Sequence, residues 1–149
     1  MNKQPNQYSW KQRVLQDIIL FFIGGLIYMG IELMWRGYSD ISMFFVGGVC
    51  FVLIGLLNEP MKLRNIKIRW QMLIGGCIIV TPLEFIAGYI LNIRLSLGIW
   101  DYSNLPGNVM GQICPLFTFL WCLLSIVCIF IDDIVRHKLF KQEYPKYYF

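Results

Sequence analysis

The chain has 149 residues, of which 57% are hydrophobic and only 15% charged, with a mean hydropathy of +0.57 and a net charge of +4. A soluble domain carries about 25% charged residues, so this composition argues against a soluble globular protein and indicates a single membrane domain over residues 1–149. The basic residues flank apolar runs and do not form one continuous face, which argues against nucleic acid as a partner.

Four apolar runs follow one another along the chain, at about 14–35, 42–58, 70–92 and 109–131. A helix needs about 20 residues to cross the hydrocarbon core of a bilayer, and each run falls within the working range. The first run is too long for the apolar part of a signal peptide, and no small-residue cleavage site follows it. The sequence therefore predicts an all-α integral membrane protein, a four-transmembrane-helix bundle whose immediate partner is the lipid bilayer.

Lysine and arginine are concentrated in three places: the N-terminal segment, the connection 59–69 and the C-terminal tail. The other two connections each carry one basic residue, Arg36 and Arg94. By the positive-inside rule, both termini and the basic loop 59–69 are cytoplasmic, and the loop 93–108 lies outside. We expect a multi-pass protein of the plasma membrane with cytoplasmic N and C termini.

Small and polar residues recur every three or four positions in each run, and such stripes are typical of faces that pack helix against helix in lipid. Pro82 falls near the middle of the third run. It cannot donate a backbone hydrogen bond, so a kink with a freed carbonyl is expected there. The five cysteines lie in apolar runs without metal-ligand spacing, and we interpret them as free thiols. No metal or cofactor is expected.

Glu84 carries the main functional signal, because an ionisable side chain inside a spanning helix usually has a function or a partner. Glu32 and Arg36 are spaced i,i+4 and are expected to pair. We predict an outward-facing polar cavity with Asp101 in the loop above it and Gln112 at the start of the fourth helix. Its predicted ligand-binding residues are Glu84, Glu32, Arg36, Trp100, Asp101, Tyr102 and Gln112. In the alternative, Glu84 is protonated, or bonded to Arg36 or Arg94, and only fixes the bundle.

The second half of the outer loop is polar, aromatic and rich in turn formers. Such a loop can fold back over the bundle as a cap or remain a solvent-facing connection, and turn chemistry does not separate the two. At the opposite end, Glu59, Asp132 and Asp133 are interpreted as helix-end charges within reach of water.

Three segments together resemble a known family: Glu32-Leu-Met-Trp-Arg-Gly37, Leu83-Glu-Phe-Ile-Ala-Gly88, and Trp100-Asp-Tyr-Ser-Asn-Leu-Pro106 followed by Gly111-Gln-Ile113. The chain resembles the putative ABC-transporter type IV membrane proteins over roughly residues 15–130. The resemblance implies a small polytopic protein that acts as a permease component. It places the family's motif on Glu32, Glu84, Gly88, Trp100, Asp101, Tyr102, Ser103, Gly111 and Gln112.

The chain contains no phosphate-binding loop of the G-x-x-x-x-G-K-[ST] type. An ATPase or a larger permease subunit would therefore have to act in trans, and the bundle could also form a homo-oligomer. The sequence favours a transporter component or a small-ligand-binding membrane subunit. Two alternatives stay open: a membrane-embedded enzyme acting on a lipid-linked or small apolar substrate, and an accessory protein that modulates a partner. The sequence shows no metal cluster and no nucleophile–base arrangement, which speaks against an enzyme.

Overall fold

A computed structural model describes residues 9–141 and 146–148 of the chain. Within them lie four helical segments that are long and apolar enough to cross a membrane: Trp10–Arg36, Ile41–Leu63, Ile68–Arg94 and Pro115–Phe140. The first is α1 (Trp10–Arg36), the second α2 (Ile41–Leu63) and the last α5 (Pro115–Phe140). The third consists of α3 (Ile68–Leu73), η1 (Ile74–Val80), α4 (Thr81–Gly88) and η2 (Tyr89–Arg94). The predicted all-α bundle of four spanning helices is thereby confirmed.

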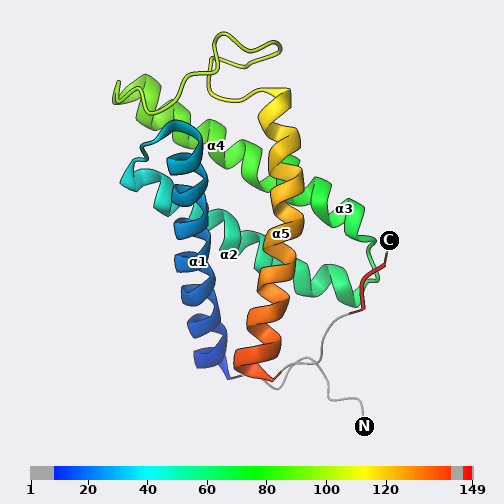
Figure 1. The fold of residues 1–149 in the computed structure, drawn as a ribbon. Helices are drawn as coiled ribbons and strands as arrows, with labels where there is room; N and C mark the ends of the chain where they lie inside the picture. The colour runs from blue at the N-terminus through cyan, green and yellow to red at the C-terminus, as the bar shows by residue number, and fades with distance from the viewer. Residues whose placement is uncertain (1–8, 142–145, 149) are drawn as a thin grey trace.

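The helices run alternately up and down, so the start of α1 and the end of α5 lie at the same end of the bundle (Figure 1). We call this the inner end. In the same view α1 and α5 stand roughly upright, while α2 and the third span cross them obliquely. The connection 95–114 covers the opposite, outer end (Figure 1).

The connection between α2 and α3 is shorter than predicted. Helix α2 continues through Pro60 to Leu63, and α3 begins at Ile68, so the basic loop shrinks from 59–69 to residues 64–67. The proline lies only one turn from the C-terminal end of α2, close to where the helix would stop in any case. The positively charged residues of this region therefore lie partly on helical backbone at the inner end.

The fourth span begins at Pro115 and ends at Phe140, several residues later at both ends than the predicted 109–131. Gly111 has φ +70°, and Cys114 has an extended backbone, so a helix cannot pass through this segment. Proline is favoured in the first turn of a helix, where its missing N–H costs nothing. Gln112 therefore lies in the outer loop, which extends to residue 114, and the prediction that it starts the fourth helix is wrong.

Helices α1 and α2 form a tight hairpin because two pairs of glycines allow their backbones to approach. A Cβ atom added to Gly24 would lie 2.4 Å from the Phe51 ring, and one added to Gly48 would lie 2.7 Å from the Phe21 ring. Lipid provides no hydrophobic drive between helices, so this close packing supplies the attraction.

The third span approaches α5 in the same way and adjusts its backbone around Pro82. The N–H of Thr81 donates to the carbonyl of Gly76 five residues earlier, and the Thr81 hydroxyl donates to the same carbonyl at 2.9 Å. This wide π-helical geometry takes up the disruption before the proline that the sequence predicted as a kink. A Cβ on Gly76 would lie 2.5 Å from the backbone nitrogen of Cys122, so glycine also permits the contact with α5.

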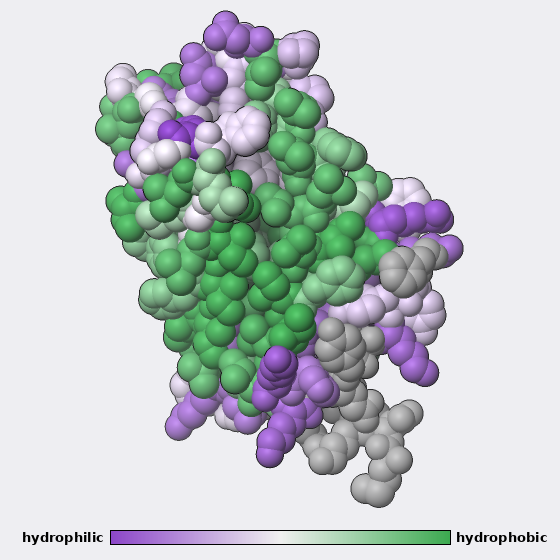
Figure 2. All heavy atoms as spheres, in the orientation of Figure 1, coloured by the Kyte–Doolittle hydropathy of each residue, from purple (hydrophilic) through white to green (hydrophobic). Residues whose placement is uncertain are grey.

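The surface of the bundle has the polarity that a bilayer requires. Hydrophobic residues form a broad band over α1 and α5, and hydrophilic residues gather at both ends of the molecule (Figure 2). The outer hydrophilic group covers the loop 95–114, and the other lies at the inner end. The chain is a multi-pass membrane protein.

Candidate functional site

Glu84 lies on α4 in the outer half of the bundle and is only 2% exposed. One carboxylate oxygen accepts a hydrogen bond from the Tyr102 hydroxyl at 3.0 Å. The other accepts one from the Trp121 indole nitrogen at 2.6 Å. Both partners are neutral donors. Among the ion pairs of the described residues, none includes Glu84.

The two arginines that sequence reasoning offered as partners of Glu84 are engaged elsewhere. Arg36 pairs with Glu32, and the Arg94 guanidinium lies 5.5 Å from the centre of the Tyr89 ring. Glu84 therefore does not fix the bundle through a bond to Arg36 or Arg94. Its buried carboxyl group has no cation beside it.

Aromatic rings surround this carboxyl group. Tyr102 stacks on Phe117 of α5, with ring centroids 4.3 Å apart and an angle of 9° between the planes. Trp121 of α5 stacks on Tyr28 of α1 at 5.5 Å and 21°. These stacks fix the two donors from separate elements, the outer loop and α5, so that both point at one acid group. Burial raises the pKa of Tyr102 above its ordinary value, so the hydroxyl stays a donor.

Sequence reasoning missed Trp121. Trp121 lies in the fourth apolar run, and the sequence analysis assigned it no role. A buried indole N–H needs an acceptor, and the acid group of an adjacent spanning helix is the obvious one. That argument would have linked Trp121 to Glu84 without a structure.

Glu32 and Arg36 form the predicted i,i+4 ion pair near the outer end of α1. The Ser39 hydroxyl also donates to Glu32, at 2.6 Å, and Arg36 donates to the carbonyl of Ile99 in the outer loop. Because this glutamate has both a cation and a hydroxyl donor, its charge is matched locally. The pair joins α1 to the outer loop.

The outer loop folds against the bundle through Trp100, Gln112 and Asn92. The Trp100 indole donates to the carbonyl of Gln112 at 3.0 Å, and the Asn92 amide donates to the Gln112 side chain at 2.8 Å. Ile99 and Trp100 are buried against Met43 of α2. The loop is thus a cap on the outer end, the first of the two arrangements that the sequence left open.

Asp101 lies apart from these contacts, on the exposed surface of the loop. Its carboxylate accepts hydrogen bonds from the hydroxyl and the backbone N–H of Ser103, and these hold the pKa of Asp101 below its usual range. A Cβ atom on Gly111 would lie 2.7 Å from this carboxylate. The structure therefore brings Glu84 and Tyr102 together, ties Glu32, Arg36, Trp100 and Gln112 to the same cap, and leaves Asp101 at its rim.

A second buried polar cluster, which we call the inner network, lies at the inner end of α5. Asp132 and Asp133 are 0% and 1% exposed. The interpretation of these residues as helix-end charges within reach of water is wrong. The i,i+4 pair of Asp132 and Arg136 keeps the sequence helical as far as Phe140, so the aspartates face the bundle.

The inner network joins three helices and the C-terminal segment. Asp132 accepts hydrogen bonds from Gln16 of α1 at 3.1 Å and from Asn58 of α2 at 2.9 Å, in addition to its ion pair with Arg136. Asp133 accepts from Lys62 and, at 2.7 Å, from the Tyr147 hydroxyl. Each aspartate therefore has a cation and neutral donors, which is the arrangement that makes a buried charge tolerable.

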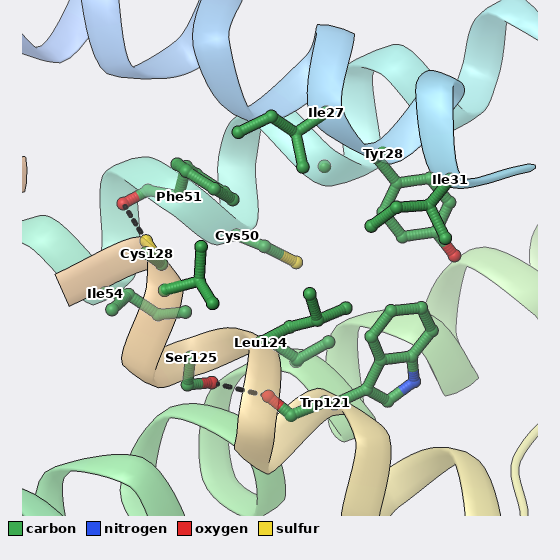
Figure 3. Close-up of a pocket in the computed structure, with 13 residues that line it drawn as sticks. Ile27, Tyr28, Ile31, Cys50, Phe51, Ile54, Trp121, Leu124, Ser125 and Cys128 are labelled. Atoms are coloured by element: carbon green, nitrogen blue, oxygen red, sulfur yellow. Dashed lines mark hydrogen bonds between the residues drawn. The ribbon is translucent and has the colours of Figure 1, made fainter. Parts of the chain in front are cut away.

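The carboxyl group of Glu84 can hold a proton, or it can bind a cation or a hydrogen-bond donor of a ligand. The Glu84 side chain is only 2% exposed, so a ligand must displace neighbouring side chains such as Tyr102 or Trp121 to reach the carboxyl group. The predicted open polar cavity thus stays a prediction. One pocket of the described residues is apolar and is lined by residues of α1, α2, η1 and α5 (Figure 3).

Comparison with known proteins identifies one family. The model of the family described as putative ABC-transporter type IV matches residues 19–148. The chain matches none of the curated proteins and none of the solved structures with which it was compared. The matched range contains Glu84 and every residue of the inner network except Gln16.

Proposed function

Because the chain belongs to the putative ABC-transporter type IV family, we propose that it is a transporter component or small-ligand-binding membrane subunit whose ligand binds at Glu84. The observation that carries this proposal is the buried carboxyl of Glu84, held only by the neutral donors Tyr102 and Trp121. A membrane protein that needed this position only for packing would be more stable with an apolar residue there.

The surroundings of Glu84 support a binding role. The acid lies below a loop that closes the outer end, and Tyr102, one of its two donors, belongs to that loop. Movement of the loop would free one carboxylate oxygen while Trp121 still held the other. A ligand with a positive charge or a strong donor would then replace a neutral hydrogen bond by a charge-assisted one, which is stronger.

The proposed orientation places the Glu84 site on the outer side of the plasma membrane. The connection between α2 and α3, with its basic residues, lies at the inner end, where α1 begins and α5 ends (Figure 1). By the positive-inside rule this end faces the cytoplasm. The covered end with Glu84 and the Glu32–Arg36 pair then faces outward, so the ligand enters from outside or from the outer leaflet.

The proposed partner is an ATPase or larger permease subunit acting in trans, and several copies of this chain can assemble around one pathway. The sequence has no phosphate-binding loop, and four helices packed around a small apolar pocket leave little room for a substrate route. Transport through this family member therefore requires additional helices from another chain.

The test is purification of the full-length protein from native membranes in mild detergent, followed by identification of bound proteins and small molecules. We expect an ATPase or permease at a fixed ratio and a small molecule that is absent from the Glu84→Gln preparation. Glu59→Gln is the control, because Glu59 belongs to the inner network through Arg136. Equal retention of the small molecule in Glu84→Gln and the wild type would reject the site, and recovery of the chain without other proteins would reject the partner.

A further inference from the structure

An apolar pocket of about 40 Å³ lies between the helices of the bundle (Figure 3). It adjoins the Glu84 site, because its lining residue Trp121 donates to Glu84. Ile27 and Ile31 of α1 form one side, and Leu124 and Val127 of α5 form the other. Its floor includes Cys50 and Ile54 of α2. The volume exceeds severalfold the roughly 10–15 Å³ that a single water needs, but the lining offers water almost no polar partner. An apolar group is therefore the suitable occupant.

The pocket has an exposed side at α1 and α5, because its lining residues Ile31 and Val127 are 36% and 45% exposed. These two helices carry the broad hydrophobic band of the surface (Figure 2). Two contacts join these helices. Gln16 bonds to Asp132 toward the inner end, and Tyr28 stacks on Trp121 about one turn before Ile31 along α1. A hydrocarbon chain can enter the exposed side of the pocket directly from the bilayer, because lipid chains surround the protein there.

The apolar pocket and the acid group share one wall. Tyr28 and Trp121 line the pocket, and the indole N–H of Trp121 donates to Glu84 at 2.6 Å. A molecule whose apolar end fills the pocket can therefore place its polar end at Glu84 by replacing the indole donor. The two features act together as one amphipathic site, with an apolar half open to lipid and an acidic half closed by the outer loop.

The chemistry of the polar end follows from charge. The other buried carboxylates of the described residues, Asp132, Asp133 and Glu32, each pair with a lysine or arginine, whereas Glu84 has only neutral donors. A protonated amine supplies both the missing charge and a hydrogen bond. An anionic head group would instead meet the carboxylate in a medium of low dielectric constant, where like charges repel strongly.

We propose that the ligand of this protein is an amphipathic cation, a primary amine on an aliphatic chain. The aliphatic chain lies in the apolar pocket lined by Ile27 and Val127, and the ammonium group lies at Glu84. This inference rests on the proposed function, because it names the ligand class of the same site. The amine is protonated at neutral pH in the way a lysine side chain is. The ligand reaches the site from the membrane, and its charge is neutralised where the protein has left a carboxyl without a cation.

The experiment uses the full-length protein in nanodiscs of zwitterionic lipid. The probes are decylamine and decanol, each with a bromine atom on the chain, and the readout is saturable quenching of tryptophan fluorescence. Trp121 lies in the pocket wall, so Trp121→Phe identifies its share of the signal. Ile27→Phe narrows the pocket. Leu26→Phe is the matched control, because Leu26 is the adjacent residue, is 64% exposed and does not line the pocket.

We expect decylamine to quench saturably in the wild type and in Leu26→Phe, and the saturable part to disappear in Ile27→Phe and Trp121→Phe. Glu84→Gln should weaken decylamine binding about 30-fold or more, as removal of one partner of a buried charge pair does, and leave decanol binding unchanged. If Ile27→Phe does not fold, Val127→Phe at the opposite rim provides the same obstruction.

Two results would overturn the inference while leaving the proposed function intact. If saturable decylamine binding is weakened by Glu84→Gln but unchanged in Ile27→Phe, the aliphatic chain does not bind in the pocket. Equal loss of decylamine and decanol in Glu84→Gln would reject the ammonium assignment. Binding that is insensitive to both Glu84→Gln and Ile27→Phe would reject the inference, and with it the placement of the ligand at Glu84.

Discussion

The two ends of this bundle each bury acidic side chains, but they differ in the partners that these acids have. At the inner end, Asp132 and Asp133 are surrounded by Arg136, Lys62 and a set of neutral donors. At the outer end, Glu84 is equally buried, but its partners are one phenol and one indole. The inner aspartates are matched in charge within the chain, and Glu84 is not.

This difference separates a structural role from a binding role. A buried charge with a complete set of partners holds helices in register, and removing one partner is severely destabilising. A buried acid without a cation contributes little to stability and remains available to a proton or a ligand. The predictions below test whether the two regions behave as differently as their partners suggest.

The largest effect is expected from Arg136→Met, which leaves Asp132 buried without its cation and also removes the contact of Arg136 with the carbonyl of Gly55. We expect a loss of about 3–5 kcal/mol in the free energy of unfolding. Thermal unfolding in detergent micelles measures it. The double variant Asp132→Asn with Arg136→Met should recover part of this loss, since no unpaired charge remains. A double variant less stable than Arg136→Met would contradict the assignment.

The second effect concerns the contact between the outer loop and the third span. A Cβ atom on Gly88 would lie 2.4 Å from the Gln112 side chain and 2.9 Å from the Trp100 ring. Gly88→Ala should cost about 1–3 kcal/mol through overpacking and release the cap. Limited proteolysis of the loop 95–114 reports the release. Gly30→Ala is the control, because nothing lies within 4 Å of its added Cβ, and it should leave the loop protected.

An equal or smaller effect is expected from Tyr102→Phe, which keeps the stack on Phe117 and removes only the hydroxyl donor to Glu84. Loss of one hydrogen bond to an acid group costs about 1.5–3 kcal/mol when the acid is charged and about 0.5–1.5 kcal/mol when it is neutral. The difference in free energy of unfolding between the wild type and Tyr102→Phe therefore shows whether Glu84 is charged. A variant as stable as the wild type would show that this hydrogen bond contributes nothing.

The smallest effect is expected from Asp101→Asn. The Asp101 carboxylate is exposed, and water can replace the hydrogen bonds that Ser103 donates to it. The pKa of Asp101 is lowered in the folded state, so its stabilising contribution is present above the ordinary carboxyl pKa and is lost as the pH falls through the lowered value. Between pH 6 and 8 the wild type and the variant should have the same melting temperature. A clear difference in that range would place Asp101 in a buried contact.

Much of this architecture could be predicted from the sequence. Run length and apolarity predicted the four spans, and the i,i+4 spacing predicted the Glu32–Arg36 pair. The stripes of small and polar residues predicted close packing of the helices, and the structure places Gly24 and Gly48 in the α1–α2 contact. These features depend on local chemistry and helical periodicity, which a sequence expresses directly.

The remaining features depend on contacts between distant elements. Gln112 was assigned to a helix because the segment after Val109 is mildly apolar, but the backbone at Gly111 and the extended Cys114 interrupt it. Asp132 was judged exposed because it follows an apolar run that was long enough to span without it. Its burial depends on Gln16 and Asn58, residues on two other helices, and a pattern within one helix does not reveal such partners.

The most direct test of the account is the thermal stability of Glu84→Gln beside that of Asp132→Asn, measured in the same detergent. In Glu84→Gln the new amide can accept from Trp121 and donate to the Tyr102 hydroxyl, so we expect a melting temperature equal to or above that of the wild type. We expect a clear fall for Asp132→Asn, because Arg136 loses its buried counter-charge. A comparable fall in Glu84→Gln would show that the acid is structural and would contradict the assignment of Glu84 as the ligand site.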